Sequence, residues 1–315
     1  MPKQLWWKKH RPVTLDSFIF QNEDQERKIT KYVKDKNIPH TLLHGAKGSG
    51  KTTLGRILIN ALVPAEYQDN DVLVINGSLD GKIDNIRTQL INHVNSVPMG
   101  DVKIVFVDEA DGLSASAQNS LRGILEKYDD NSRVIFTANY VNKLTPELRS
   151  RFTEFKFSNL KESKILEYCV DVLDDEGVDI EDKDNMAALK QLSKLYSHDF
   201  RKLVSALENA TEGDKIYADS IDDESLNDKL ELIDLINQDN WMKARELVAG
   251  NFPDEELVDV YRFLYDYLED IDKFSEDVTK WKKGIVVISD HMYRHAIHPD
   301  QEINFASCLI RLSEI

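Results

Sequence analysis

The chain has 315 residues, of which 41% are hydrophobic and 30% charged, and its 40 Lys and Arg against 56 Asp and Glu give a formal net charge of −16. This composition is too apolar for a disordered chain, and the length is that of about two ordinary domains. A net charge of this sign repels nucleic acids and anionic membranes, which excludes an indiscriminate polyanion binder.

Short apolar runs in the first half of the chain predict buried strands. The runs are rich in β-branched residues and show little polar alternation, as expected of strands covered on both faces. They lie at 41–44, 72–75, 103–107 and 133–137, and helices are predicted at 23–36, 51–62, 82–96 and 114–127. This alternation of strand and helix favours an α/β fold in which a parallel sheet is covered by helices.

The strand signal ends after about Phe157. Three short helices are predicted at 161–175, 184–196 and 199–210, then an acidic linker at 211–224 and further helices over about 225–313. We therefore expect three units: an α/β domain at 1–158, a small helical domain at 159–215 and an all-helical domain at 216–315.

The charge is distributed unevenly over these units. Residues 1–158 carry 22 basic and 19 acidic side chains, a net of +3, whereas residues 159–315 carry 18 and 37, a net of −19. Two cysteines, Cys169 and Cys308, are too few for a disulfide framework or a four-thiolate zinc site. No apolar stretch approaches the ~18 residues of a membrane span. We expect a reduced, cytoplasmic protein without a membrane partner.

Residues 45–52 read Gly-Ala-Lys-Gly-Ser-Gly-Lys-Thr and fit the phosphate-loop pattern G-x-x-x-x-G-K-[ST] between a predicted strand and a predicted helix. Glycines let backbone N–H groups surround phosphate oxygens, and the helix start adds its positive dipole end. Lys51 can reach the β- and γ-phosphates, and the Thr52 hydroxyl can ligate Mg²⁺. The alternative is an ordinary glycine-rich turn. The expected nucleotide-binding residues here are Gly45, Gly48, Ser49, Gly50, Lys51, Thr52 and Thr53.

A second carboxylate motif, Asp108-Glu109, ends the predicted strand at 103–107. The carboxyl ends of parallel strands border the crevice where ligands bind. Asp108 is expected to hold Mg²⁺, directly or through water, and Glu109 to act as the general base that polarises the attacking water. Taken alone, an apolar strand that ends in two acidic residues is common; the preceding phosphate loop gives the pair its meaning.

These motifs are followed by Thr137-Ala-Asn139 and by Leu148-Arg-Ser-Arg-Phe152, and the order resembles that of the AAA+ ATPases and, within them, of the sliding-clamp loader subunits. Lys9-His-Arg-Pro12 resembles the K-Y-R-P box of that family, and Ser150-Arg151 resembles its S-R-C motif. The chain departs from the family at Phe152, where Cys is usual, and its phosphate loop lacks the usual prolines.

The resemblance implies roles for further residues. Asn139 would contact the γ-phosphate or the attacking water, Arg151 would act in trans in a neighbouring subunit's site, and Arg201 would touch the γ-phosphate from the small helical domain. Either arginine could instead be an ordinary surface residue, and the aromatic and aliphatic members of the adenine set could be plain core residues. The segment that would wrap the adenine supplies Trp7, Lys8, Lys9, His10, Arg11 and Ile19.

Among clamp loaders, the chain looks most similar to the large ATPase subunit of T-even-type bacteriophages, notably at Asp80-Gly-Lys-Ile-Asp84 and Asp199-Phe-Arg-Lys202. The resemblance implies an AAA+ ATPase domain, a helical lid domain and an oligomerising helical collar over the three units given above. If the source is viral, the compartment would be the cytoplasm of the host.

The resemblance further implies an ATP-hydrolysing subunit, with ATP and Mg²⁺ as cofactors, that opens a ring-shaped sliding clamp and loads it onto primer–template DNA, hydrolysis triggering release. Its partners would be other copies of itself and a small clamp-loader subunit in a ring-like assembly. Such complexes grip phosphates irrespective of sequence. Candidate DNA contacts are Lys82, Arg87, Ser78 and Ser114, although a solvated helix surface is the ordinary alternative for the cations.

Gln118 and Arg122 lie four residues apart on one face of a predicted helix, and could link the DNA and ATP sites or form a simple surface pair. Two other functions compete with clamp loading. A helicase or origin initiator on the same motor should carry a winged-helix C-terminal domain, whereas 225–315 is predicted all-helical. A non-hydrolysing scaffold would not need Glu109, Asn139 and Arg151.

Overall fold

The computed structural model describes residues 4–78, 83–128, 132–158, 160–196, 199–217, 224–268, 271–275 and 277–315. The chain divides into two compact units, Met1–Ile221 and Asp222–Ile315, and each is described by itself. Within the described residues, no helix is both long enough and apolar enough to cross a membrane.

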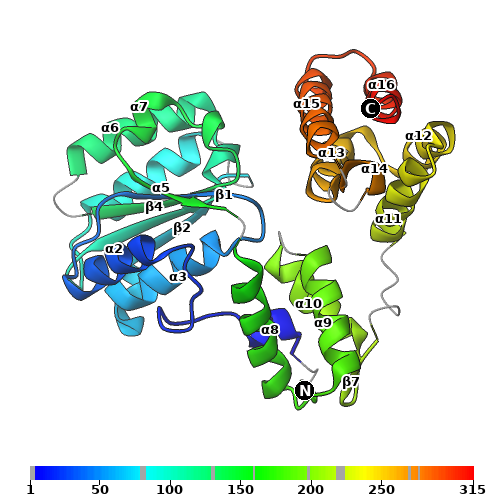
Figure 1. Ribbon diagram of the computed structural model, residues 1–315. Coiled ribbons are helices and arrows are strands. Elements are labelled where there is room, and N and C mark those ends of the chain that lie inside the picture. The colour runs from blue at the N-terminus through cyan, green and yellow to red at the C-terminus, as the bar shows by residue number, and fades with distance from the viewer. Residues whose placement is uncertain are drawn as a thin grey trace. The chain divides into compact units, whose positions relative to one another are not determined.

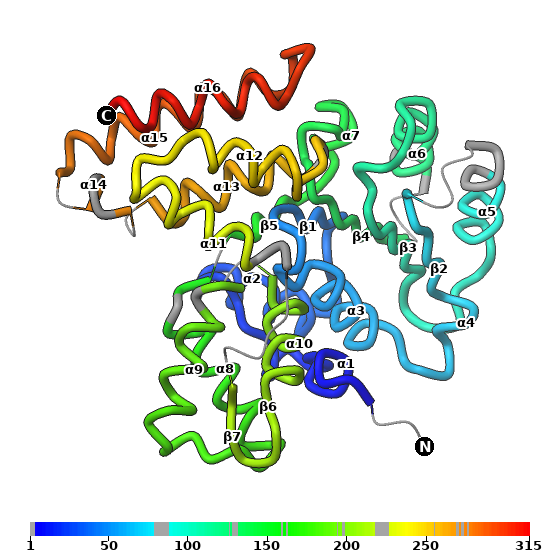
Figure 2. Tube along the Cα trace, turned by 90° about the vertical axis from the view of Figure 1, so that its right-hand side faces the viewer, coloured from blue at the N-terminus to red at the C-terminus, as the bar shows by residue number. Residues whose placement is uncertain are grey.

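The first unit is built on a five-stranded parallel sheet with the order β2-β3-β4-β1-β5 (Figures 1 and 2). Its strands are β1 Thr41–Gly45, β2 Val72–Asn76, β3 Lys103–Asp108, β4 Ser132–Ala138 and β5 Thr153–Phe157. The four predicted strands are confirmed. The prediction missed β5, because this edge strand alternates exposed and buried residues over only five positions.

Helices cover both faces of this sheet, which makes a three-layer α/β/α sandwich (Figure 1). Alternate residues of β3 serve the two layers: Ile104 and Phe106 pack with α2 and α3, whereas Val105 and Val107 pack with α5 and α6. The predicted helices are confirmed as α2 Glu23–Lys34, α3 Lys51–Leu62, α5 Ile83–Asn95 and α6 Ala115–Tyr128. Three helices of four residues each were not predicted: α1 Trp6–Lys9, α4 Gln68–Asp71 and α7 Pro146–Arg149.

Three helices after β5, together called the lid here, complete the first unit. They are α8 Glu162–Asp175, α9 Lys183–Leu195 and α10 Phe200–Ala210. The predicted linker begins instead with a short antiparallel hairpin, whose strands of two residues each are β6 Thr211–Glu212 and β7 Lys215–Ile216. The buried Asn185 side chain fixes this hairpin, since it donates to the Asp214 carbonyl at 2.8 Å and accepts from the Ile216 N–H at 2.8 Å.

The described part of the second unit contains only helices, as the sequence predicted. They are α11 Glu224–Asn237, α12 Trp241–Asn251, α13 Leu257–Asp266, α14 Asp272–Ser275, α15 Val278–His295 and α16 Gln301–Ser313, with a short 3-10 turn at Asp254–Glu256. A polar cluster lies in its core, where Asn304 Nδ2 donates to the Tyr261 hydroxyl at 3.0 Å and Asn304 Oδ1 lies 2.9 Å from His291 Nδ1. These bonds join α13, α15 and α16.

A fully buried ion pair stabilises the end of the sheet opposite the carboxyl ends of the strands. Lys103 Nζ, at the start of β3, lies 3.4 Å from Asp71 Oδ1, and neither side chain is exposed. Lys103 also donates to the Asn70 carbonyl at 2.7 Å. Burial would raise the pKa of Asp71, but N–H groups of Met99 and Gly100 donate to its carboxylate and hold that pKa below its usual range.

We predict that Lys103→Met destabilises the protein by about 3–5 kcal/mol at pH 7, because it leaves a buried carboxylate without its cation. Thermal unfolding measures the effect. The pKa of Asp71 is lowered in the folded protein. Its carboxylate therefore contributes to the free energy of unfolding above about pH 4, and this contribution is lost as the pH falls further. The double variant Lys103→Met/Asp71→Asn should have a higher melting temperature than Lys103→Met alone, because it no longer buries an unpaired carboxylate. A wild-type melting temperature for Lys103→Met would contradict a stabilising role of this ion pair.

Candidate nucleotide-binding site

A pocket lies at the carboxyl ends of β1, β3 and β4 in the first unit. Four parts of the chain form its walls: the N-terminal segment, the phosphate loop with the start of α3, the strand ends, and the lid helices α8 and α10. The lining residues are Trp7, Arg11, Pro12, Phe18, Ile19, Lys47, Gly48, Ser49, Gly50, Lys51, Thr52, Thr53, Asp108, Glu109, Thr137, Asn139, Leu160, Tyr168, Asp199, Phe200, Arg201 and Val204.

The phosphate loop has the backbone that an anion cradle requires. Gly50, immediately before α3, has φ +92°, and Gly48 has φ +76°, both in the left-handed region that favours glycine. A Cβ on Gly48 would lie 2.3 Å from Asp199 Oδ1, so the loop also approaches the lid too closely for any side chain. N–H groups at the start of α3 therefore face the pocket from a loop that only glycine can form.

Lys51 is bound by its own loop. Its Nζ donates to the carbonyls of Gly45 and Ala46 at 2.9 and 2.6 Å, and the residue is 6% exposed. Burial lowers its pKa to about 8, against the opposing attraction of Asp111 and Asp108. A phosphate in the loop would compete for the same ammonium group, which is the role that the sequence predicts for Lys51.

A hydroxyl network holds the carboxylate pair at the ends of β3 and β4. Asp108 Oδ1 accepts hydrogen bonds from the hydroxyls of Thr52 and Thr137 at 2.8 and 2.5 Å. The Thr137 hydroxyl in turn accepts from the Glu109 N–H at 2.9 Å. Glu109 has φ +56°, a strained value for this residue type, and its side chain is exposed at the pocket. Thr137 therefore fixes both carboxylate residues.

The same network supplies the donor set that Mg²⁺ prefers. Thr52 and Asp108 contribute hydroxyl and carboxylate oxygens side by side, next to the phosphate loop. No cluster of three or more His, Cys, Asp or Glu side chains suited to a metal ion occurs among the described residues. The Thr52 and Asp108 oxygens beside the loop fit a cation that is held by one or two protein oxygens together with phosphate oxygens, as Mg²⁺ usually is with nucleotides.

Asp111 anchors the end of β4. Its carboxylate accepts from the N–H groups of Asn139 and Tyr140 at 3.2 and 3.1 Å, which holds the backbone that carries the Asn139 side chain at the pocket. Asn139 thus lines the pocket together with Asp108 and Glu109.

Cations and aromatic rings meet at the other side of the pocket. Arg11 Nε donates to the Thr53 hydroxyl at 3.0 Å, and the Arg201 guanidinium carbon lies 5.2 Å from the centre of the Trp7 ring. Burial and the nearby charges of Arg56 and Arg201 lower the pKa of Arg11, and Asp108 opposes them. Such mutual repulsion among arginines favours a polyanionic ligand between them.

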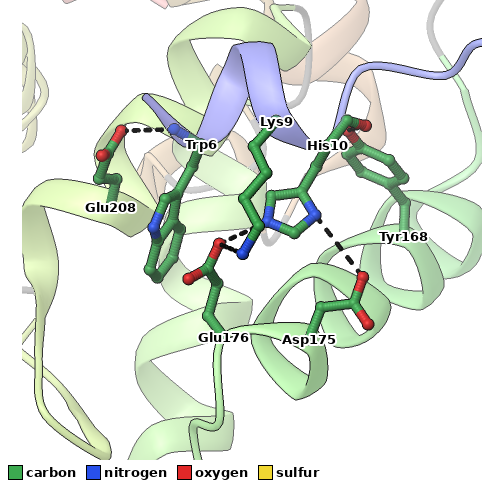
Figure 3. Close-up of polar contacts among 7 residues, drawn as sticks. All are labelled: Trp6, Lys9, His10, Tyr168, Asp175, Glu176 and Glu208. Atoms are coloured by element: carbon green, nitrogen blue, oxygen red, sulfur yellow. Dashed lines mark hydrogen bonds and ion pairs between the residues drawn. The ribbon is translucent and has the colours of Figure 1, made fainter. Parts of the chain in front are cut away.

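Several predicted site residues lie outside this pocket. Lys8 Nζ lies 5.2 Å from the Trp7 ring centre, whereas Lys9 and His10 pair with Glu176 of the lid (Figure 3). Gly45 contributes a carbonyl to Lys51. Arg151 is exposed in the turn after α7 and does not line the pocket.

The predicted DNA contacts are only partly described. Ser78 is exposed after β2, and the Ser114 hydroxyl accepts from the Ala117 N–H at 3.2 Å at the start of α6. Lys82 and the side chain of Arg87 lie outside the described residues. Their contact with DNA is therefore a prediction that rests on the sequence.

Gln118 does not form a surface pair, because its residue is 3% exposed. Its amide nitrogen donates to the carbonyls of Leu113 and Lys143 at 3.1 Å each, and its amide oxygen accepts from the Thr145 N–H at 2.8 Å. Gln118 thereby joins the start of α6 to the start of α7, which leads to Arg151.

Some pocket residues carried no functional prediction. Some of these are apolar or aromatic residues that belong to no sequence motif and that only the folded chain brings together. They are Phe18, Leu160, Tyr168 and Val204. Others lie within motifs that the sequence displays, although the sequence predicted no role for them in nucleotide binding. They are Pro12, Lys47, Thr137, Asp199 and Phe200. Asp199 could have been found as the N-cap of α10, where its carboxylate accepts from the Arg201 and Lys202 N–H groups.

Comparisons with known proteins identify the fold and the family of the chain. The RuvB Holliday junction branch migration motor of Thermotoga maritima has a TM-score of 0.55 at 21% identity, over 72% of this chain and 79% of that chain, which shows the fold alone. Residues 41–160 match the AAA family, "ATPase family associated with various cellular activities". Fold and pocket together define an AAA ATPase.

The Archaeoglobus fulgidus replication factor C small subunit is 34% identical over 252 residues, 78% of this chain and 77% of that protein. The Thermofilum pendens replication factor C small subunit is 29% identical over 324 residues, 99% of this chain and 97% of that protein. Within the AAA ATPases, the chain belongs to the family of the replication factor C small subunits.

We predict that Lys51→Ala weakens ATP binding by about 100-fold, because it removes the buried ammonium that the carbonyls of the phosphate loop hold. Equilibrium titration with a fluorescent ATP analogue measures this, and Lys31→Ala, at an exposed position of α2, is the control. A phosphate beside Lys51 stabilises its charged form. Wild-type affinity should therefore fall as the pH rises above about 8, by up to about tenfold per unit.

Lys51→Ala should lack this alkaline loss of affinity, since the titrating group has been removed. Undiminished ATP affinity in Lys51→Ala, or an unchanged pH profile, contradicts the assignment of the loop.

Proposed function

We propose that the chain is an ATP-hydrolysing subunit of a sliding-clamp loader, which uses ATP and Mg²⁺ to open a ring clamp and load it onto primer–template DNA. The observation that carries this proposal is kinship with replication factor C small subunits over nearly the whole chain, in a protein whose pocket retains Lys51, Asp108 and Glu109. The proposed units are an ATPase domain at 1–158, a lid at 159–215 and a collar at 216–315.

In this proposal the Glu109 carboxylate takes a proton from water as the water oxygen bonds to the γ-phosphorus, while the bond from γ-phosphorus to the bridging oxygen of ADP breaks. Asn139 orients that water. Mg²⁺, held by Thr52 and Asp108, would supply charge neutralisation at the phosphate oxygens. Lys51 and Arg201 would bind the same phosphate oxygens from the loop and the lid.

The pocket would be completed by a second subunit. Arg151 lies outside its own pocket in an exposed turn, which supports a role in trans in the site of a neighbouring copy. An arginine added to such a site neutralises the charge of the transferred phosphoryl group. Hydrolysis would then require the assembled multi-subunit complex, as expected of a clamp loader.

Contacts with other copies and with a small clamp-loader subunit are assigned to the second unit. Val286 and Tyr293 of α15 are 66% and 73% exposed and lie seven residues apart, hence on one face of the helix, and Ile297 beyond its end is 70% exposed. An apolar surface of this kind on an otherwise acidic domain supports a protein interface.

A separate exposed apolar loop supports contact with the clamp. Val97 and Met99, between α5 and β3, are 84% and 64% exposed, while the N–H groups of Met99 and Gly100 are held by Asp71. The loop lies at the sheet end opposite the pocket, so a clamp bound there leaves the nucleotide accessible. DNA would contact Lys82, Arg87, Ser78 and Ser114 through its phosphates.

We further propose that the chain is of the T-even bacteriophage type and acts in the host cytoplasm, on the basis of residues 80–84 and 199–202 alone. A helicase function is less well supported. Likeness to RuvB concerns the fold, and the described part of the second unit contains only helices and no strand of a winged helix.

We predict that Arg151→Ala leaves ATP binding within about twofold of wild type but lowers hydrolysis by the assembled complex about 1,000-fold, because the site loses its trans cation. Steady-state phosphate release measures the turnover. Arg149→Ala is a matched control: it removes an arginine two residues away that forms a bidentate pair with Glu154, at 3.0 Å for each bond.

Mixing separates a role in trans from one in cis. Arg151→Ala subunits combined with Lys51→Ala subunits should recover part of the turnover, since the Lys51→Ala copies supply Arg151 to intact pockets. No recovery on mixing contradicts the role in trans.

For the function itself, we predict that clamp and primed DNA together raise ATP hydrolysis by the assembled complex at least about tenfold over either alone. Val97→Asp/Met99→Asp should abolish the response to the clamp while ATP affinity stays unchanged, because the loop lies away from the pocket. Absence of any joint stimulation, or ATP-driven strand displacement by the isolated protein, would overturn clamp loading.

A further inference from the structure

An N-terminal strap, residues 6–12, connects the lid to the phosphate-loop helix. At the lid side, α1 packs against α10: the Trp6 N–H donates to Glu208 Oε2 at 3.0 Å, and the Trp6 residue is only 4% exposed. At the other side, Arg11 bonds Thr53 of α3 at 3.0 Å. The strap thus contacts both walls of the pocket.

His10 forms a largely buried polar contact between the strap and the lid (Figure 3). Its Nε2 lies 2.6 Å from Glu176 Oε1, and the two side chains are 7% and 10% exposed. Its Nδ1 lies 3.7 Å from the carboxylate of Asp175, which is largely exposed. The Tyr168 hydroxyl donates to the His10 carbonyl at 3.0 Å, so that the backbone is held as well.

Lys9 brings an ammonium group to the same carboxylate, with Nζ 2.8 Å from Glu176 Oε1. Burial would raise the pKa of Glu176, but the bonds from Lys9 and His10 hold it below its usual range. Glu176 caps the C-terminal end of α8. One carboxylate at the end of a lid helix therefore receives two consecutive side chains of the strap.

The residues on either side of this contact line the pocket. Trp7 lies one turn of α1 before His10, with the Arg201 guanidinium 5.2 Å from its ring centre, and Arg11 and Pro12 follow His10 directly. Any movement of the lid away from the strap would separate Trp7 from Arg201.

We propose that His10 and Glu176 are positioning residues, which clasp the strap to the lid so that Trp7 and Arg201 are held together for nucleotide binding. The proposal rests on the proposed function only in taking the pocket as the ATP site. Neither residue touches the reacting atoms, so the clasp sets nucleotide affinity and leaves the chemical step alone. Since both side chains are largely shielded from water, water and salt screen their contact less than they screen an exposed pair.

The test uses the full chain with the variants His10→Ala, Glu176→Ala and both together, and ADP carrying a fluorescent methylanthraniloyl group as the probe. We expect each single variant to weaken ADP binding about tenfold, and the double variant to be no weaker than the singles, because both remove one contact. In the assembled complex the KM for ATP should rise correspondingly, with kcat at saturating ATP within about twofold.

Two further variants distinguish positioning from folding. His10→Gln keeps a hydrogen-bond donor toward Glu176 and should retain most of the wild-type affinity. Lys9→Met removes a half-exposed cation and should weaken ADP binding two- to threefold, roughly, without a change in melting temperature. Lys36→Ala is the control, since it breaks an exposed pair with Asp101, of 3.3 Å, outside the pocket.

The clasp is overturned if the single variants bind ADP like wild type, if their melting temperatures fall while the affinity does not, or if the two losses multiply in the double variant. A wild-type chain that failed to bind ADP would overturn the proposed function and the clasp together, whereas normal wild-type binding with unchanged His10→Ala affinity overturns the clasp alone.

Discussion

The hydrogen bond between the Thr137 hydroxyl and the Asp108 carboxylate joins the ends of two neighbouring strands, and the geometry of the pocket depends on it. Through the same carboxylate it reaches Thr52 at the start of α3, and through the Glu109 N–H it holds a residue in the left-handed region. A parallel sheet supplies this arrangement, because its strands all end at one edge. At that edge, the hydrogen bonds of Asp108 with Thr52 and Thr137 fix the positions of the carboxylate and hydroxyl oxygens.

The lid forms the second wall of the pocket. It meets the phosphate loop where Gly48 closely approaches Asp199, and it meets the strap through Trp6, which packs against α10, and through the contact of His10 with Glu176. The position of the lid over the phosphate loop depends on these contacts, whereas the strand ends are fixed by the hydrogen bonds of the sheet itself.

Most of the sheet and the phosphate-binding edge followed from the sequence, because β1, β3 and β4 are continuous apolar runs and each ends in a motif. Local patterns could not supply β5, the hairpin after α10 or the short α1, since each is held by partners far along the chain. The pairing of His10 with Glu176 spans 166 residues, and Tyr168 reaches the pocket from a helix without a motif. Periodicity reports which residues are buried, but gives no information on which distant residues they meet.

Net charge gave the least direct guide to function. A chain of charge −16 would repel a triphosphate if its charges were spread evenly, yet Lys51, Arg11 and Arg201 converge on one pocket. Screening limits the reach of an exposed charge to about 8 Å in physiological salt, so these nearby cations outweigh acidic side chains farther away. The same reasoning applies to DNA: residues 1–158 are net +3, whereas 216–315 carry 10 basic and 23 acidic groups. Phosphate binding therefore depends on the placement of a few cations, and the acidity of the second unit opposes DNA binding only near its own surface.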